Sequence, residues 1–329
     1  MVELASRGPR AVDLELSTLR CVQDGRVLTA RVEAPPFNYM TGAMQQDFAR
    51  LAAAVEHDDG VGAVVVTGGV DGRYITHFDI ADILAGSDEA PALPRPVASA
   101  LVRGVKAVSA LAGERGRRLL EAGPAASLVL MARFHETVEA IMRSPAVWIA
   151  AVNGPCGGGG LELSVFFDLR IAATSARFVL PELSIGLATT FGGQRLAALV
   201  GPSRALEMML EARAYTADEV HGWGLVNHVV DDDALLEHAL ALAARYARRP
   251  RGTVAAQKAI FNDPDAVGLR ESLTREAIAQ TVGVPSRTTR AALREWLRRQ
   301  DPSGDSTFLT DPEPWRTGTA VEMNPGRDR

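Results

Sequence analysis

Two glutamates lie close to a run of glycines in the middle of the chain and could carry proton-transfer chemistry. The segment AVNGPCGGGGLEL, residues 151–163, places four consecutive glycines before Glu162, and Glu182 follows in RFVLPELSIGL. Two carboxylates shielded from water can hold one water molecule and move protons, provided that their surroundings keep one acidic and the other basic. Either glutamate alone is more typical of a helix start, where a carboxylate stabilises the helix dipole. Their joint position beside the glycines favours acid–base chemistry.

The glycine run could bind a developing negative charge. A helix that opens on Gly158, Gly159 and Gly160 presents unpaired N–H groups, and the missing Cβ atoms let a ligand oxygen come close. Tight packing of a strand against a helix explains the same glycines equally well. The run lacks the Lys-Ser or Lys-Thr of a phosphate loop and the ribose-binding acid of a dinucleotide site. It therefore indicates an oxyanion hole or a packing device and disfavours a nucleotide site.

Composition excludes several classes of protein. The chain has 329 residues, 47% of them hydrophobic, and a formal net charge of −5, so it can bury a large core and has no overall attraction to nucleic acid. Cys21 and Cys156 are too few for a disulfide framework and lack the spacing of metal ligands. The first residues contain no apolar signal-peptide core, and no later run suggests a membrane span. We expect a soluble, cytoplasmic protein without a metal.

The first part of the chain predicts an α/β fold. Residues 19–32 predict a hairpin, because two β-rich runs flank Asp24-Gly25. A helix is expected after Thr41, with apolar positions at Phe48, Leu51 and Val55. The next apolar run, GAVVVTGG, predicts a strand buried on both faces. Strand, helix and strand in this order are typical of a βαβ unit.

Later segments suggest three parts. Residues 1–200 are expected to form the core, interrupted by an insertion at about 84–132 that is rich in proline and glycine and could be a lid or a surface excursion. After it, a helix ended by Pro145, a strand, the glycine run, a helix and a strand follow. Residues 201–300 predict a helical subdomain used for oligomerisation. The last residues, 301–329, predict a flexible tail.

Several motifs together resemble the crotonase, or enoyl-CoA hydratase/isomerase, superfamily. They are AVNGPCGGGGLEL, PELSIGL, FGGQRLAALVG and ARAYTADEVHGWGLVNHVV, and the likeness runs from about residue 19 to 262 apart from the insertion. It implies a spiral core of ββα repeats with a C-terminal helical subdomain, and an acyl-CoA thioester as the substrate, with no resident cofactor. By residue-to-residue match, Gly159 donates an oxyanion N–H, and Glu162 and Glu182 are the catalytic acids.

The second oxyanion donor of the superfamily precedes an aspartate, and this chain has RYITHFDIADIL at that place. The resemblance implies that Phe78 supplies the N–H and that Asp79 shapes the turn. His77 replaces a glycine of the superfamily. It could be an extra general base or a donor to the substrate, whereas a packed or solvated histidine of structural role is the alternative.

The resemblance carries further expectations. Arg73 and Lys258 are candidates to bind the phosphates of CoA, and the chain is expected to form a homotrimer or a dimer of trimers, with neither nucleic acid nor membrane as a partner. The superfamily's GGTQRL is one residue shorter here, GGQRL, and Thr189-Thr190 precedes it. The loop beside Glu182 is therefore expected to be reshaped, and acyl specificity cannot be carried over.

Three functions remain open at this point. The first is hydration of a 2-enoyl-CoA, favoured because both glutamates are present. The second is another enolate reaction on an acyl-CoA, such as double-bond isomerisation, decarboxylation or C–C hydrolysis, suggested by His77 and the altered loop. The third is a non-catalytic acyl-CoA-binding scaffold protein, suggested by the bulky segment Thr76-His77-Phe78.

Overall fold

The computed structural model describes residues 10–112, 116, 126–262, 268–301 and 304–322. The strands are β1 (Leu19–Asp24), β2 (Val27–Val32), β3 (Ala63–Gly68), β4 (Val147–Val152), β5 (Pro155–Gly157), β6 (Leu169–Ala173), β7 (Arg177–Val179), β8 (Tyr215–Thr216) and β9 (His228–Val230). The α-helices are α1 (Gly42–His57), α2 (Ile80–Glu89), α3 (Arg95–Leu111), α5 (Ala126–Arg143), α6 (Gly159–Ser164), α7 (Gly193–Val200), α8 (Pro202–Glu211), α9 (Ala217–Gly222), α10 (Leu235–Tyr246), α11 (Arg251–Asn262), α12 (Leu269–Gly283), α13 (Arg287–Arg299), α14 (Thr307–Thr310) and α15 (Glu313–Arg316). Short 3₁₀ helices are η1 (Ala11–Asp13), η2 (Glu182–Ile185) and η3 (Asp232–Ala234).

The larger sheet has the strand order β1-β2-β3-β4-β6-β9. β1 and β2 form the predicted antiparallel hairpin, with Asp24 opposite Val27, and the other neighbouring pairs are parallel. β3 is buried along its whole length, as predicted. The α/β prediction is thus confirmed.

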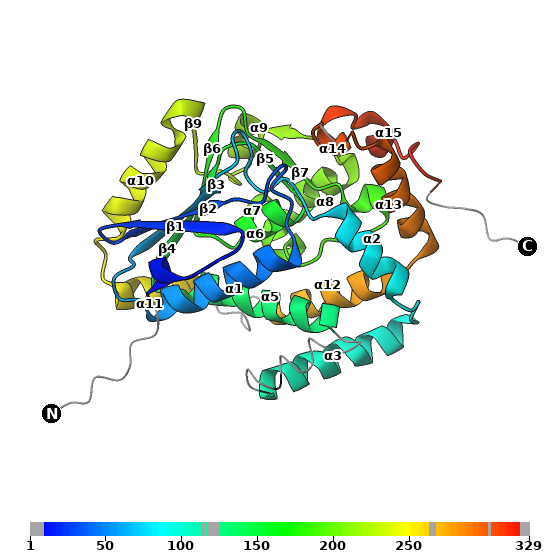
Figure 1. The fold of residues 1–329 in the computed structure, drawn as a ribbon, viewed down its shortest axis with the longest axis horizontal. Coiled ribbons are helices and arrows are strands. Elements are labelled where there is room, and N and C mark those ends of the chain that lie inside the picture. Colours follow the sequence, from blue (N-terminus) through cyan, green and yellow to red (C-terminus); the bar gives the residue numbers. More distant parts are fainter. Residues whose placement is uncertain (1–9, 113–115, 117–125, 263–267, 302–303, 323–329) are drawn as a thin grey trace, which may run out of the picture.

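Alternate residues of the central strands face two different cores. Val64 and Val66 of β3 belong to a large core with side chains of α1 and α5, and Val65 belongs to a second core with side chains of α10. This follows from the two-residue period of a strand, which sends successive side chains to opposite faces. Helices therefore cover both faces of the sheet (Figure 1).

A smaller sheet, β5-β7-β8, leads the chain into the glycine run. β5 pairs in parallel with β7, and Gly157 lies opposite Val179. The next residue, Gly158, has a φ of 41°, in the region that favours glycine, and α6 begins directly afterwards. The smaller sheet thus fixes where α6 starts, and with it the position of Glu162.

The predicted insertion is partly helical. α3 packs against α5 and α12 through buried Ala98, Val102 and Ser109, and Figure 1 shows it at the edge of the molecule. Its other side leaves apolar side chains such as Leu111 exposed. The glycine-broken part at 113–115 and 117–125 lies outside the described residues.

The sheets continue past the boundary predicted at residue 200. β8 pairs with β7, β9 pairs with β6, and α10 covers one face of the larger sheet. The strand HVV at 228–230 was not among the sequence predictions. Residues 201–300 therefore contribute strands to the core as well as helices.

The prediction of a flexible tail is wrong for residues 304–322. α14 and α15 fold against α13, and Phe308 and Trp315 are buried in one cluster with Trp296. The rings of Phe308 and Trp315 lie 5.3 Å apart, and those of Phe308 and Trp296 5.7 Å. Two large aromatic side chains supply enough apolar surface to order a segment that is otherwise rich in Pro, Gly and Asp.

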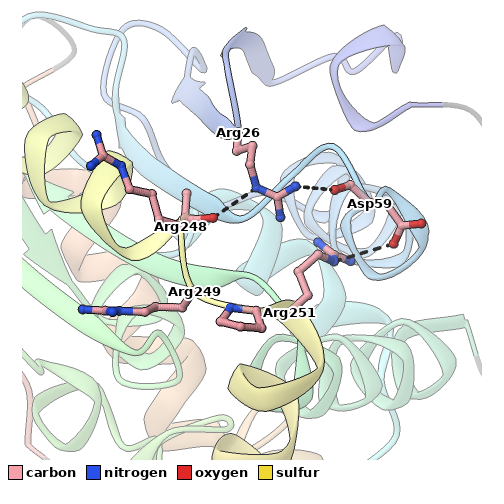
Figure 2. A pocket seen from close by; sticks show the side chains of 7 residues that line it. Arg26, Asp59, Arg248, Arg249 and Arg251 are labelled. Carbon is pink, nitrogen blue, oxygen red and sulfur yellow. Dashed lines mark hydrogen bonds and ion pairs between the residues drawn. The ribbon is translucent and has the colours of Figure 1, made fainter.

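Arginines join two helix ends at a surface pocket of about 420 Å³ (Figure 2). Arg26 donates to the carbonyls of Ala247 and Asp59, and Arg251 donates to those of Val55, Glu56 and Val61. Cations favour the carboxyl ends of helices, which here are the ends of α10 and α1. These two side chains therefore connect the ends of the two helices.

Truncating Phe308 to alanine is expected to lower the free energy of unfolding by about 3–5 kcal/mol, because it opens a cavity among buried rings. The matched substitution Phe261→Ala removes a ring that is 66% exposed and is expected to cost less than about 0.5 kcal/mol. Urea unfolding of both variants gives the comparison. Equal stability of the two variants would show that the C-terminal segment does not pack as described.

Candidate active site

Gly158 brings the two predicted acids together. A Cβ atom at this position would lie 2.8 Å from Oε1 of Glu182, and Glu162 sits in the first turn of the helix that Gly158 precedes. Both glutamates are buried, at 2% and 7% exposed. Glu162 and Glu182, which are separate in the sequence, therefore lie together in the interior of the fold.

Glu162 is held by one of its two oxygens. Oε1 accepts from the N–H of Thr190 at 2.5 Å and of Phe191 at 3.4 Å, whereas Oε2 is buried and has no hydrogen bond among the described residues. Burial, and next the neighbouring Glu182, raise the pKa of Glu162 well above its ordinary value, although the two N–H groups oppose this. Its free oxygen is therefore a candidate proton donor.

Glu182 begins η2 directly after Pro181. Burial raises the pKa of Glu182 to about 7, and its own backbone N–H opposes the change. Its Oε2 is also buried without a hydrogen bond within the described part of the chain. Burial thus raises the pKa of both acids, and a pair of close buried carboxylates resists full ionisation, so one of the two can carry a proton while the other acts as a base.

Phe78 and Gly159, the expected oxyanion donors, are neighbours. A Cβ on Gly159 would lie 2.7 Å from the ring of Phe78, and Phe78 forms a β-bridge with Met40. That bridge uses the carbonyl of His77 and the N–H of Asp79. No hydrogen bond from the N–H of Phe78 or Gly159 is present among the described residues. Within the described residues, neither N–H group is therefore committed to another acceptor.

His77 does not point into this site as a base or a substrate donor. Its ring stacks on Tyr39 at 4.5 Å, and Phe308 packs edge-on at 5.6 Å. Nδ1 donates to the carbonyl of Phe78 at 2.5 Å and Nε2 accepts from the hydroxyl of Ser306 at 2.8 Å. Burial lowers the pKa of His77 to about 4, so the ring is neutral at pH 7. These contacts favour the structural alternative for this histidine.

Lys258 is a second correction. Its ammonium donates to the carbonyls of Ile141 and Ala146 at 3.0 and 3.1 Å and to the carboxylate of Asp168 at 2.8 Å. An ammonium has three N–H groups, so all of them are used, and the side chain is buried. Lys258 therefore joins α11 to Ile141, Ala146 and Asp168, and it has no N–H left to donate to a phosphate.

Asp79 and Arg73 lie at the edge of the site. Asp79 is the N-cap of α2 and accepts from the N–H of Ala81 and Asp82, which agrees with its expected role in the turn. Arg73 forms an ion pair with Asp305, and its guanidinium lies 5.2 Å from the ring centre of Phe37. The ion pair uses Nη1 of the guanidinium, so a phosphate at Arg73 would bind beside the carboxylate of Asp305.

One residue of the site was not among the sequence predictions. Glu276 of α12 lies close enough to Glu162 to add to the repulsion on it. Its surrounding sequence, RESLTREAIAQ, is that of an ordinary charged helix and contains no motif that would single it out. Only the packing of α12 against α7 brings this glutamate to the site.

Comparisons with known proteins identify the family. A model of the enoyl-CoA hydratase/isomerase family matches residues 112–302, more than half of the chain. A Mycobacterium leprae protein named probable enoyl-CoA hydratase is 31% identical over 246 residues, 74% of each chain. The chain belongs to the enoyl-CoA hydratase/isomerase family.

Other members extend the likeness. A crotonyl-CoA hydratase of Syntrophomonas wolfei is 40% identical over 132 residues, which are 40% of this chain and 51% of that one. A Streptomyces avermitilis structure classed among the enoyl-CoA hydratases has a TM-score of 0.72 and 24% identity, and it covers 92% of this chain and 97% of its own. At that identity the likeness shows the fold, which is that of the crotonases.

Among the described residues, no three or more His, Cys, Asp or Glu side chains gather as metal ligands. In the same part of the chain, no helix is both long and apolar enough to cross a membrane.

Replacing Glu182 by glutamine is expected to stabilise this family member at alkaline pH. A carboxyl group with a raised pKa in the folded state loses stability as pH rises from about 4.5 through about 7, because its buried charge must then form. At pH 8 the variant should exceed the parent by about 1–3 kcal/mol, and at pH 4.5 the difference should vanish.

Urea unfolding at the two pH values measures this difference. Glu207→Gln, on the exposed face of α8, serves as the control and should change stability by less than about 0.5 kcal/mol. A Glu182→Gln protein that is less stable than the parent at pH 8 would contradict the assigned environment.

Proposed function

We propose that the protein adds water to a 2-enoyl thioester of coenzyme A. The observation that carries this proposal is the pair of buried carboxylates, Glu162 and Glu182, each with one free oxygen, beside the neighbouring residues Phe78 and Gly159. The relative named crotonyl-CoA hydratase supports the same reaction class. Hydration needs an acid and a base at once, and this site offers two carboxyl groups in different environments.

In the proposed reaction, the thioester oxygen accepts hydrogen bonds from the N–H groups of Phe78 and Gly159. Glu182 removes a proton from water as the water oxygen bonds to the β-carbon, and the electrons of the double bond move onto the thioester as an enolate. The protonated Glu162 then gives its proton to the α-carbon. The proton taken up by Glu182 returns to Glu162 before the next turnover, so the sum is the addition of one water.

The proposed donors act on the charge that develops during the reaction. Backbone N–H groups directed at an enolate oxygen need no reorganisation, and the loss of one such donor in other enzymes costs about 10²–10³ in rate. Because these donors are backbone atoms, the phenylalanine at position 78 is compatible with the role. The side chain of Phe78 would instead shape the space near the acyl group.

The alternative enolate reactions have less support than hydration. They were suggested by His77, and the ring of this residue is enclosed between Tyr39 and the C-terminal segment, so it is not placed to act on a substrate. An isomerase needs only one carboxylate to move a proton between the α and γ carbons, so the second buried acid would have no task.

We also propose a homotrimeric assembly, because exposed apolar side chains of α3, such as Val97, Leu101 and Leu111, offer a contact surface.

Glu162→Gln and Glu182→Gln are each expected to lower kcat for hydration of crotonyl-CoA by about 10²–10⁴, because each removes one proton-transfer group. Loss of absorbance of the conjugated enoyl thioester follows the reaction. Glu207→Gln, the same substitution at an exposed position, should keep the parent rate.

Full activity of both variants would refute the proposal. A parent that leaves crotonyl-CoA unchanged but moves the double bond of a 3-enoyl-CoA would favour the isomerase alternative. A parent that binds acetoacetyl-CoA in calorimetry but converts neither thioester would favour the non-catalytic scaffold, and a protein that binds no acyl-CoA would support none of the three functions.

A further inference from the structure

The carboxylates of Glu162 and Glu276 both accept hydrogen bonds from the backbone of the segment Thr189–Gln194. Glu162 accepts from the N–H groups of Thr190 and Phe191, at the start of the segment. Oε1 of Glu276 accepts from the N–H of Gln194 at 3.2 Å, at its end. The backbone that orients Glu162 is therefore anchored at its other end by Glu276.

In the folded chain, Gly192 and Gly193 lie between Glu162 and Glu276. A Cβ on Gly192 would lie 2.8 Å from Cα of Glu162 and 3.2 Å from its Cγ. A Cβ on Gly193 would lie 3.1 Å from Oε1 of Glu276. Glu162 and Glu276 thus lie against consecutive residues of one short segment, and this explains why the charge of Glu276 acts on Glu162.

Among the described residues, the carboxyl group of Glu276 has no ion pair with a cation, and its Oε2 is buried without a hydrogen bond. Burial raises the pKa of Glu276 to about 7, although the N–H groups of Gln194 and Gly193 oppose this. Five residues earlier on α12, Glu271 is exposed and pairs with Arg103 and Arg275.

Helix capping alone does not account for Glu276. An acidic group at the start of α7 stabilises the helix dipole, but a neutral acceptor such as glutamine could accept the same N–H. Burying a carboxylate without a cation costs free energy, and a buried polar atom without a partner calls for an explanation. What distinguishes a glutamate from a glutamine here is the charge that Glu276 places near Glu162 once the pH rises above its own pKa of about 7.

We propose that Glu276 is a positioning residue for Glu162, which fixes the segment Thr189–Gln194 and, through its charge, keeps Glu162 protonated as the proton donor. The role in hydration rests on the function proposed above, whereas the effect on Glu162 does not. Glu276 acts through the segment and through electrostatic repulsion and touches no reacting atom in this account.

The other titratable groups around the cluster come from three further elements. Glu182 of η2 faces Glu162 and is part of the reaction. His135 of α5 lies beside the backbone of Thr190, and burial, with Lys106 of α3, lowers the pKa of His135 to about 3. This histidine is neutral above pH 5 and does not compensate for a charge on Glu276.

Glu276→Gln tests the proposal, because glutamine keeps the acceptor for Gln194 and removes the charge. Infrared titration of the protein without substrate follows the protonated-carboxyl band that disappears in Glu162→Gln. In Glu276→Gln this band should be lost at lower pH than in the parent. Glu271→Gln, which removes an exposed charge from the same helix, should leave the band at the parent pH.

The pH dependence of kcat for crotonyl-CoA is the second readout. Glu276→Gln should keep most activity at pH 6 and lose roughly ten-fold more than the parent at pH 9, because Glu162 then loses its proton earlier. Glu276→Asp, which retains a charge, should stay closer to the parent in its pH profile. Circular dichroism and the Tm of each variant establish that it is folded.

A parent-like infrared titration of Glu276→Gln would overturn the proposal, and so would identical pH profiles for the aspartate and glutamine variants. If the parent does not hydrate enoyl-CoA, the proposed function fails, and the infrared titration still decides whether Glu276 controls the proton on Glu162. The two failures are thus distinguishable.

Discussion

The burial of carboxylates without cations is the constraint on which the site depends. Glu162, Glu182 and Glu276 each have one buried oxygen with no hydrogen bond among the described residues, and backbone N–H groups hold the others in part. Charging such groups is expensive, so they bind protons near neutral pH. Burial of these carboxyl groups lowers the stability of the fold, and the same burial brings their pKa values into the range that acid–base chemistry requires.

Backbone groups contribute more to the surroundings of these carboxylates than side chains do. The smaller sheet ends at Gly157, Gly158 turns the chain into α6, and the segment Thr189–Gln194 covers Glu162 from the other side. Backbone dipoles are fixed by the sheets and helices around them, so they do not have to reorganise when a charge develops. In this respect the proposed oxyanion donors and the groups that hold Glu162 are alike.

The local parts of this arrangement were accessible from the sequence. The hairpin, β3, and the helix start at the glycine run depend on neighbouring residues, and their patterns predicted them. His77 was different, because its partner Ser306 is 229 residues away in a segment whose composition suggests a tail. Lys258 and Asp168, 90 residues apart, pair only after folding. Glu276 lies in a helix without a motif, so no sequence pattern marked it. The roles of the site residues stay predictions.

The central claim is that one thioester oxygen meets the N–H groups of Phe78 and Gly159 while Glu162 and Glu182 flank the reacting carbons. A crystal structure with bound acetoacetyl-CoA tests this most directly. The account predicts that the thioester oxygen lies about 2.7–3.1 Å from both nitrogen atoms, with the two carboxylates beside the α and β carbons. A thioester oxygen that contacts neither N–H, or an acyl chain that lies away from both glutamates, would contradict it.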